Sequence, residues 1–220
     1  MANELPAPTL ATADYLLLKC RLPGGTKLAL VAQQFCTMQL LALHRAAWLP
    51  ENEPPGTSFS KAFVYARLPV RTRLPVHGLL TWQKAWQRFC PLAQAVSVSR
   101  LELALDQPGC SQNETAAFHY VVETDPQPGW ADEIFRWYDT EHMPGLAKVP
   151  GCVHARRLLN HDHGWHAGLD HGPLSLACYD LVTAETLGSA PWLAVRGTAW
   201  SSITRPHFSN TRRTMMPIAA

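Results

Sequence analysis

The chain has 220 residues, 47% of them hydrophobic and 16% charged, and its formal net charge at pH 7 is +2. This length suits either one large domain or two small ones, and both can bury a core. The lysines and arginines are dispersed, so they form no basic surface of the kind that binds nucleic acid. We therefore expect a globular protein with no nucleic-acid partner.

Neither the N-terminal segment nor any apolar run suggests contact with a membrane. The opening MANELPAPTL lacks the basic and apolar stretches of a secretory signal. The longest apolar run, residues 28–48, is interrupted by glutamine, histidine and arginine, whereas a spanning helix needs roughly 18 uninterrupted apolar residues. We expect a cytoplasmic protein. The six scattered cysteines form no C-x-x-C pair and are expected to be free and mostly buried.

In the first half of the chain, apolar patterns predict strands and helices in the order β-α-β-α-β. The run over residues 14–22 ends at a Pro-Gly-Gly turn, which is typical of a strand. Residues 27–48 are apolar on most sides and are expected to form one long buried helix. A strand, a helix and a strand follow, over residues 61–68, 76–92 and 95–105. A further strand, around residues 70–74, is expected to be degenerate or missing.

After a Gln-Pro-Gly segment within residues 107–112, the order of elements begins again. The expected elements are a strand, a helix, two strands joined by a hairpin loop, a helix capped by Thr183 and a last strand, over residues 116–123, 130–148, 153–159, 174–182, 184–195 and 210–218. Their order, β-α-β-β-α-β, is that of ferredoxin-like domains. The sequence thus predicts an α+β protein of two tandem ferredoxin-like repeats, a degenerate one over residues 1–110 and a complete one over residues 111–220.

Such a sheet has both helices on one face, and its other face needs a cover. That face would carry Phe118, Tyr120, Val122 or their neighbours, which are too apolar to remain in contact with water. A second sheet of the same kind, from the first half of the chain or from a second copy in a homodimer, would cover it and form an α/β barrel. Either arrangement places a ligand cavity between a helix and the concave sheet.

One segment, EIFRWYDTEHMPGLAKVPGCVHARRLLN over residues 133–160, carries a family resemblance. It resembles bacterial dimeric α/β-barrel proteins related to the EthD-like family, which have a segment of the form WYD-x-EH-x-P…PG…ARR. The matching residues are Trp137, Tyr138, Asp139, Glu141, His142, Pro144, Pro150, Gly151, Ala155, Arg156 and Arg157. The tail is also similar, at Trp200, Arg205, Pro206, His207, Phe208 and the run Asn210, Thr211, Arg212 and Arg213.

The resemblance covers the C-terminal half of the chain and implies a fold more specifically than an activity. Relatives in this superfamily include cofactor-free monooxygenases, polyketide cyclases, muconolactone isomerases, dye-peroxidase relatives and proteins with no assigned reaction. Many have a single repeat and dimerise, whereas this chain carries a further half in front. The resemblance therefore implies a pocket for a small apolar or aromatic ligand.

The expected helix over residues 130–148 carries the candidate catalytic residues. His142 lies one turn beyond Tyr138 and three residues after Asp139, so the three side chains are predicted to be neighbours. An Asp–His pair can set the imidazole tautomer and raise its basicity, which suits a general base, and the Tyr138 hydroxyl could orient a substrate oxygen. Structural roles stay open: His142 could cap helix carbonyls, and Asp139 could hold either His142 or Arg157.

Three further residues are candidate ligand contacts. Trp137 and Trp130 form a neighbouring stripe on the same helix, and either could instead belong to the core. His119 lies on the first strand of the second half and could serve as a second acid or base if it faces the concave side. A basic group near the C-terminus could bind a carboxylate or form a solvated face; its members are Arg205, His207, Arg212 and Arg213.

The loop between the two middle strands of the second half is rich in histidine, with His161, His163, His166 and His171. Such clusters can bind Zn, Ni or Cu. No cysteine or H-x-x-x-H helix accompanies them, so we expect adventitious nickel rather than a physiological metal. The sequence also lacks phosphate-binding, dinucleotide-binding and nucleophile-elbow motifs, so no cofactor is expected.

These residues favour a pocket protein that is a cofactor-independent enzyme. Its reaction would be oxygenation, isomerisation, cyclisation or decarboxylation of an aromatic or polyketide-like compound. The alternative is a non-catalytic ligand-binding or accessory protein, which a cavity no larger than a few waters beside His142 would favour. A third hypothesis is a haem or metal protein that uses His142 or the loop histidines.

Overall fold

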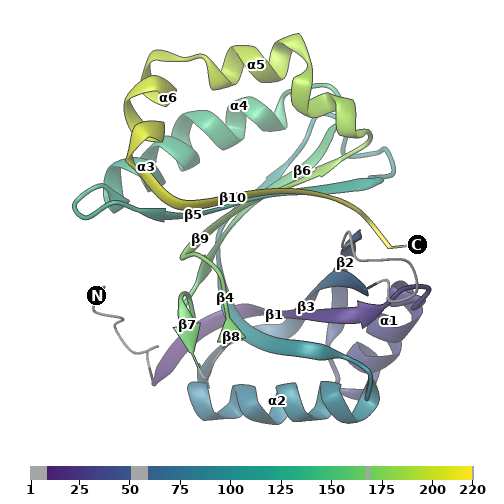
Figure 1. Cartoon of the computed structure of the whole chain (residues 1–220). Coiled ribbons are helices and arrows are strands. Elements are labelled where there is room, and N and C mark those ends of the chain that lie inside the picture. Colours follow the sequence, from purple (N-terminus) through teal and green to yellow (C-terminus); the bar gives the residue numbers. More distant parts are fainter. Residues whose placement is uncertain (1–8, 51–58, 167–168, 220) are drawn as a thin grey trace. The chain divides into compact units, whose positions relative to one another are not determined.

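The computed structural model describes residues 9–50, 59–166 and 169–219. The chain divides into two compact units (Figure 1). Unit 1 comprises Met1–Glu102, Asn160–Gly172 and Pro217–Ala220, and unit 2 comprises Leu103–Leu159 and Pro173–Met216. Each unit has its own buried core of apolar residues and is described by itself.

Unit 1 is a complete β-α-β-β-α-β unit. Its elements are β1 (Leu10–Pro23), α1 (Leu28–Met38), β2 (Ala42–Pro50), β3 (Phe59–Pro75), α2 (Val76–Phe89) and β4 (Gln94–Pro108), the last of which runs on into unit 2. The strands pair antiparallel in the order β4-β1-β3-β2. The strands expected over residues 14–22, 61–68 and 95–105 and the helix over 76–92 are confirmed.

Two expectations for the first half are wrong. Residues 27–48 do not form one helix: α1 ends at Met38, Leu40 takes a left-handed φ of 57°, and the chain continues as β2. The reason is tertiary, because β2 pairs with β3 from Ala42↔Arg67 to Pro50↔Ser60, and this pairing overrides local helical preference. Residues 70–74 belong to β3 itself, so the first repeat is not degenerate.

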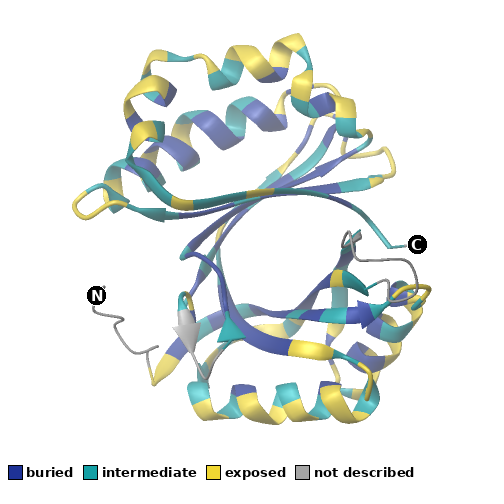
Figure 2. Ribbon diagram, viewed as in Figure 1, coloured by how far each residue is buried: buried dark blue, intermediate teal, exposed yellow. Residues whose placement is uncertain are grey.

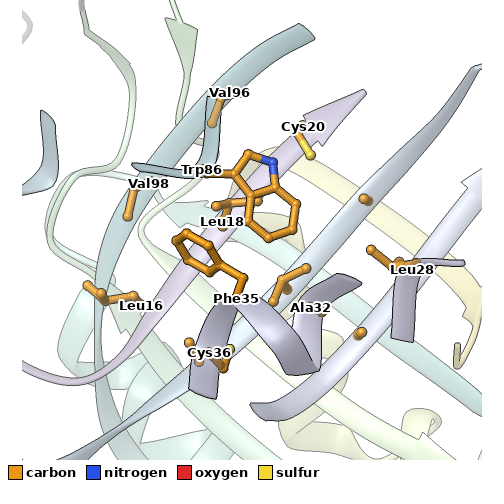
Figure 3. Packing of buried hydrophobic residues seen from close by; sticks show 14 of the residues in the cluster. Leu16, Leu18, Cys20, Leu28, Ala32, Phe35, Cys36, Trp86, Val96 and Val98 are labelled. Carbon is orange, nitrogen blue, oxygen red and sulfur yellow. The ribbon is translucent and has the colours of Figure 1, made fainter. Parts of the chain in front are cut away.

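The core of unit 1 lies between its two helices and one face of its sheet. Trp86 of α2 meets Phe35 of α1 edge to face, with ring centroids 4.9 Å apart and an interplanar angle of 81° (Figure 3). The two rings pack over Leu16, Leu18 and Cys20, which alternate along β1 and so share one face of the strand. This packing fixes both helices of unit 1 on the same face of the sheet.

Unit 2 repeats the order of elements, with its helical segments broken into short pieces. Its elements are β5 (Phe118–Pro126), α3 (Ala131–Trp137), a π turn (Tyr138–His142), α4 (Met143–Ala147), β6 (Cys152–Asn160), β9 (Ser175–Leu181), a 3-10 turn (Ala184–Gly188), α5 (Ala190–Arg196), α6 (Ala199–Thr204), a second 3-10 turn (Arg205–His207) and β10 (Phe208–Pro217). Between β6 and β9, the short strands β7 (Trp165–His166) and β8 (Leu169–Asp170) form a hairpin.

The strand order in unit 2, β10-β5-β9-β6, has the same topology as in unit 1. Its helices lie on one face of the strands, with their buried residues turned toward them (Figure 2). The helix expected over residues 184–195 is a 3-10 turn followed by α5, and α6 was not predicted. Thr183 makes no side-chain capping bond; Ser189 caps α5 instead, accepting from the Trp192 N–H.

Two expectations from composition can be compared with the structure. All six cysteines are free, and four of them are buried: Cys20, Cys36, Cys152 and Cys178. In the parts of the chain that the structure describes, no helix has the length and apolar character needed to cross a membrane.

Candidate functional site

The helix expected over residues 130–148 contains a five-residue π turn, Tyr138–His142, between α3 and α4. Such turns are rare and occur frequently at functional sites. Here the turn buries three aromatic side chains together. Trp137 and His142 stack with ring centroids 4.1 Å apart, and Tyr138 meets His142 at 5.7 Å and a steep angle of 68°.

These rings line a cavity between the helices of unit 2 and its sheet, which we call the π-turn cavity. Its lining residues are Tyr120, Val122, Trp137, Tyr138, His142, Tyr179, Trp192, Arg196, Arg205, Phe208 and Arg213. Three strands, the π turn, α3, α5 and the second 3-10 turn supply them. The cavity volume is about 30 Å³, which is space for one or two water molecules.

The His142 imidazole is neutral near pH 7. Burial lowers the pKa of His142 from 6.5 to about 3, and the positive charges of Arg205 and Arg196 contribute further. Its Nδ1 atom is buried and has no hydrogen-bond partner among the described residues. Burial also raises the pKa of the Tyr138 and Tyr179 hydroxyls, so both phenols stay protonated. The cavity therefore presents neutral donors and acceptors beside positive charge.

Asp139 does not pair with His142, contrary to the expectation of an Asp–His pair. It accepts two hydrogen bonds from Arg157 of β6, from Nε at 2.8 Å and from Nη2 at 2.6 Å. The physical reason is the π turn, whose greater width carries residue 142 to a different side of the helix from residue 139. Asp139 therefore anchors the π turn to the sheet, which is one of the two structural roles left open by the sequence.

Of the three expected ligand contacts, the structure brings only Trp137 to the cavity. His119 precedes Tyr120 on β5, and successive strand residues face opposite sides, so its side chain lies on the other face of the sheet. There its Nδ1 lies 2.7 Å from Asp180 Oδ1. Trp130 stacks on His207 with ring centroids 3.4 Å apart and does not line the cavity.

Three arginines line the cavity, and the sequence did not predict that they would meet there. Arg205 and Arg213 belong to the basic group singled out near the C-terminus, but Arg196 of α5 was not noticed. The other members of that group, His207 and Arg212, are absent from the lining. Arg205 and Arg213 had a signal in the sequence, whereas only the folded chain shows which arginines converge.

No protein-family model matches the sequence, and no curated protein matches it significantly. Solved structures do resemble it. A candidate monooxygenase from Fusobacterium nucleatum subsp. nucleatum superposes with a TM-score of 0.53 at 10% identity, covering 94% of each chain. A candidate monooxygenase from Lactobacillus acidophilus gives 0.52 at 9% identity, covering 96% of this chain and 93% of the other. An anthrone oxidase-like protein gives 0.50 at 12% identity, with coverages of 96% and 94%.

The chain has a ferredoxin-like α+β fold. At these identities the likeness to solved structures shows the fold alone. The strand orders of the two units agree with it.

The histidine loop, Asn160–Gly172, belongs to ferredoxin-like unit 1 and is tied to it by hydrogen bonds. His161 Nε2 lies 2.9 Å from Glu102 Oε2, and His171 Nδ1 lies 3.0 Å from Ser99 Oγ. Within the described ranges, no three or more His, Cys, Asp or Glu side chains are placed to hold a metal ion. The side chain of His166 lies outside the described residues.

A larger cavity, of about 300 Å³, lies within unit 1 near the start of α1. Its lining residues are Leu22, Pro23, Gly25, Thr26, Lys27, Leu28, Trp48, Ser60, Ala62 and Ala219. Lys27 is the one ionisable side chain in this set, so the cavity offers few groups for chemistry. The π-turn cavity is smaller, but polar and charged groups converge there, and we take it as the candidate site.

Proposed function

We propose that unit 2 binds a small aromatic or polyketide-like molecule in the π-turn cavity and acts on it without a cofactor. The reaction would be oxygenation, isomerisation, cyclisation or decarboxylation. The observation that supports this is the convergence of Trp137, Tyr138 and His142 with further aromatic rings around one small cavity. Apolar walls with a few converging polar groups are the usual composition of small-molecule sites. Neighbours described as candidate monooxygenases and as anthrone oxidase-like are consistent with it.

In this proposal, His142 accepts a proton from the substrate, Tyr138 donates a hydrogen bond to a substrate oxygen, and Trp137 forms a wall. The low pKa of His142 makes its imidazole a weak base. Proton transfer therefore depends on a bound group that stabilises the imidazolium. Asp139 does not contact the substrate in this proposal; it positions the π turn through its hydrogen bonds with Arg157. The proposal assigns no substrate contact to His119 or Trp130.

The proposal includes an architecture. We propose that residues 1–110 and 111–220 act as two halves of an α/β barrel of the EthD-like kind, within one chain or across a homodimer. A second sheet that covers the face without helices would explain why each unit carries its helices on one face only. Light scattering after gel filtration decides between monomer and dimer.

A second candidate function, non-catalytic ligand binding, is favoured by the volume of the cavity. At about 30 Å³ the cavity holds one or two waters, and an aromatic ring does not fit unless side chains move. In this alternative the same residues hold a ligand that is not transformed, or side chains fill the pocket.

Anthrone and dioxygen distinguish the two functions. Oxidation of anthrone by O2 to anthraquinone and water requires no cofactor, so oxygen uptake and anthraquinone absorbance both report turnover. The enzyme hypothesis predicts turnover that His142→Gln lowers by roughly 100-fold, the usual scale of general-base catalysis. Binding without turnover favours the accessory protein. Failure of anthrone and of other planar aromatics to bind at all would contradict both ligand-binding functions and leave a pocket that side chains fill.

A further inference from the structure

The π-turn cavity is positively charged in a way that its aromatic lining does not require. We propose that its ligand carries an anionic oxygen group, best a carboxylate, which Arg205 binds together with Arg196 and Arg213. This inference rests on the proposed function and names the chemical class of the ligand. Arg196 comes from α5, Arg205 from the turn before β10 and Arg213 from β10. Three arginines from separate elements therefore line one small cavity.

The charges of these arginines are not balanced by carboxylates. The cavity lining contains no Asp or Glu among its residues. The one side-chain hydrogen bond that Arg205 makes within the described chain is long, from Nη1 to the Arg196 carbonyl at 3.5 Å. A guanidinium has five N–H donors, so most of those on Arg205 are available to a ligand. Arg196 and Arg213 make no side-chain hydrogen bond or ion pair with the described residues.

Repulsion among the three arginines is unfavourable, and a bound anion would relieve it. Burial lowers the pKa of Arg205, and repulsion from Arg196 and Arg213 lowers it further. The charge of Arg205 likewise disfavours protonation of His142. One negative charge among the three guanidinium groups offsets both effects. Arginine suits this role because its planar fork binds a carboxylate through two parallel hydrogen bonds and stacks on aromatic rings.

A second, independent feature also points to a polar ligand. His142 is 8% exposed, lines the cavity, and has a buried Nδ1 atom with no partner among the described residues. Buried polar atoms are nearly always hydrogen-bonded, so an unpartnered one at a cavity suggests a missing donor or acceptor. The volume is compatible with this, because about 30 Å³ admits a group of carboxylate size without rearrangement. An aromatic body attached to this group fits only if lining side chains move.

The test compares 2-naphthoate with 2-naphthamide, which has nearly the same shape but no charge. Quenching of tryptophan fluorescence reports binding, because Trp137 and Trp192 line the cavity. We expect the carboxylate to bind at least about tenfold more tightly than the amide, as charge-assisted hydrogen bonds typically provide. Raising the salt concentration should narrow this difference.

Adjacent positions on β10 supply a matched pair of variants. Arg213 lines the cavity and Arg212 does not, so Arg213→Gln and Arg212→Gln remove the same charge on opposite faces of one strand. We expect Arg205→Gln and Arg213→Gln to weaken naphthoate binding by roughly ten- to hundredfold and naphthamide binding by less than about threefold. Arg212→Gln should leave both affinities unchanged.

Each outcome decides something. Equal affinity for acid and amide would overturn the anionic ligand while leaving an aromatic pocket. Equal losses of naphthoate affinity in the Arg212→Gln and Arg213→Gln variants would mean that the net charge of the protein, and not the cavity, attracts the carboxylate. This result would also overturn the proposed anion site. If neither naphthalene compound nor anthrone binds, the proposed function itself fails.

Discussion

The buried imidazole of His142 should make the stability of the protein depend on pH in a way that one substitution removes. Because burial lowers the pKa of His142 to about 3, the unfolded chain, with a histidine pKa of 6.5, binds a proton that the folded chain does not. The contribution is therefore fully present above pH 6.5 and is lost as the pH falls toward 3. Between pH 8 and pH 5 the loss is about 2 kcal/mol, and it reaches about 5 kcal/mol below pH 3.

Urea denaturation at pH 8 and pH 5 measures this loss, with His142→Gln as the test variant and the exposed His77→Gln as its control. The packing cost of His142→Gln is the same at both pH values and cancels in the comparison. Wild type and His77→Gln should lose about 2 kcal/mol more than His142→Gln when the pH falls from 8 to 5. Parallel losses in all three proteins would refute the reasoning, and would mean that His142 is accessible to solvent.

Three further predictions concern stability. Gly109→Ala should lower the free energy of unfolding by about 3 kcal/mol or more, because the new Cβ would lie 2.0 Å from the Cys152 carbonyl oxygen. Gly188→Ala is the control: a Cβ there has no atom within 4 Å, so the free energy of unfolding should change by less than about 0.5 kcal/mol. Asp139→Asn should cost about 1–2 kcal/mol by weakening the two bonds from its arginine partner on β6, with ligand affinity retained; a larger effect on affinity than on stability would show that it contacts ligand. In the absence of ligand, Arg205→Gln should raise the free energy of unfolding by about 0.5 kcal/mol or less, because solvent screens the repulsion between the arginines. Thermal melts should show this gain as a slightly higher melting temperature at low salt, and the gain should vanish at high salt.

The repeated fold was predictable where local patterns and final pairing agree. The strand over residues 14–22 and the helix over 76–92 carry unambiguous periodicity, and both are present as β1 and α2. The failure at residues 27–48 has the opposite cause. This apolar stretch suits a buried helix as well as a helix followed by a strand, and only pairing with β3 decides for the second.

The candidate site divides in the same way. Periodicity placed Trp137, Tyr138 and His142 close together, and all three line the π-turn cavity. Periodicity also placed Asp139 beside His142, and this was wrong because it assumes a regular α-helix. The π turn is a feature of the folded chain, and the bond from Asp139 to Arg157 of β6 accompanies it.

The sequence by itself determined the ferredoxin-like order of the second half and the aromatic character of its long helical segment, because both depend on neighbours close along the chain. The tertiary structure decided which charged side chains line the cavity. Arg196, Arg205 and Arg213 come from three elements, and their mutual repulsion exists only when the chain brings them together. Spacing along a sequence carries no information about such a distance. The basic group near the C-terminus therefore suggested a carboxylate, and only the fold shows which arginines line the cavity.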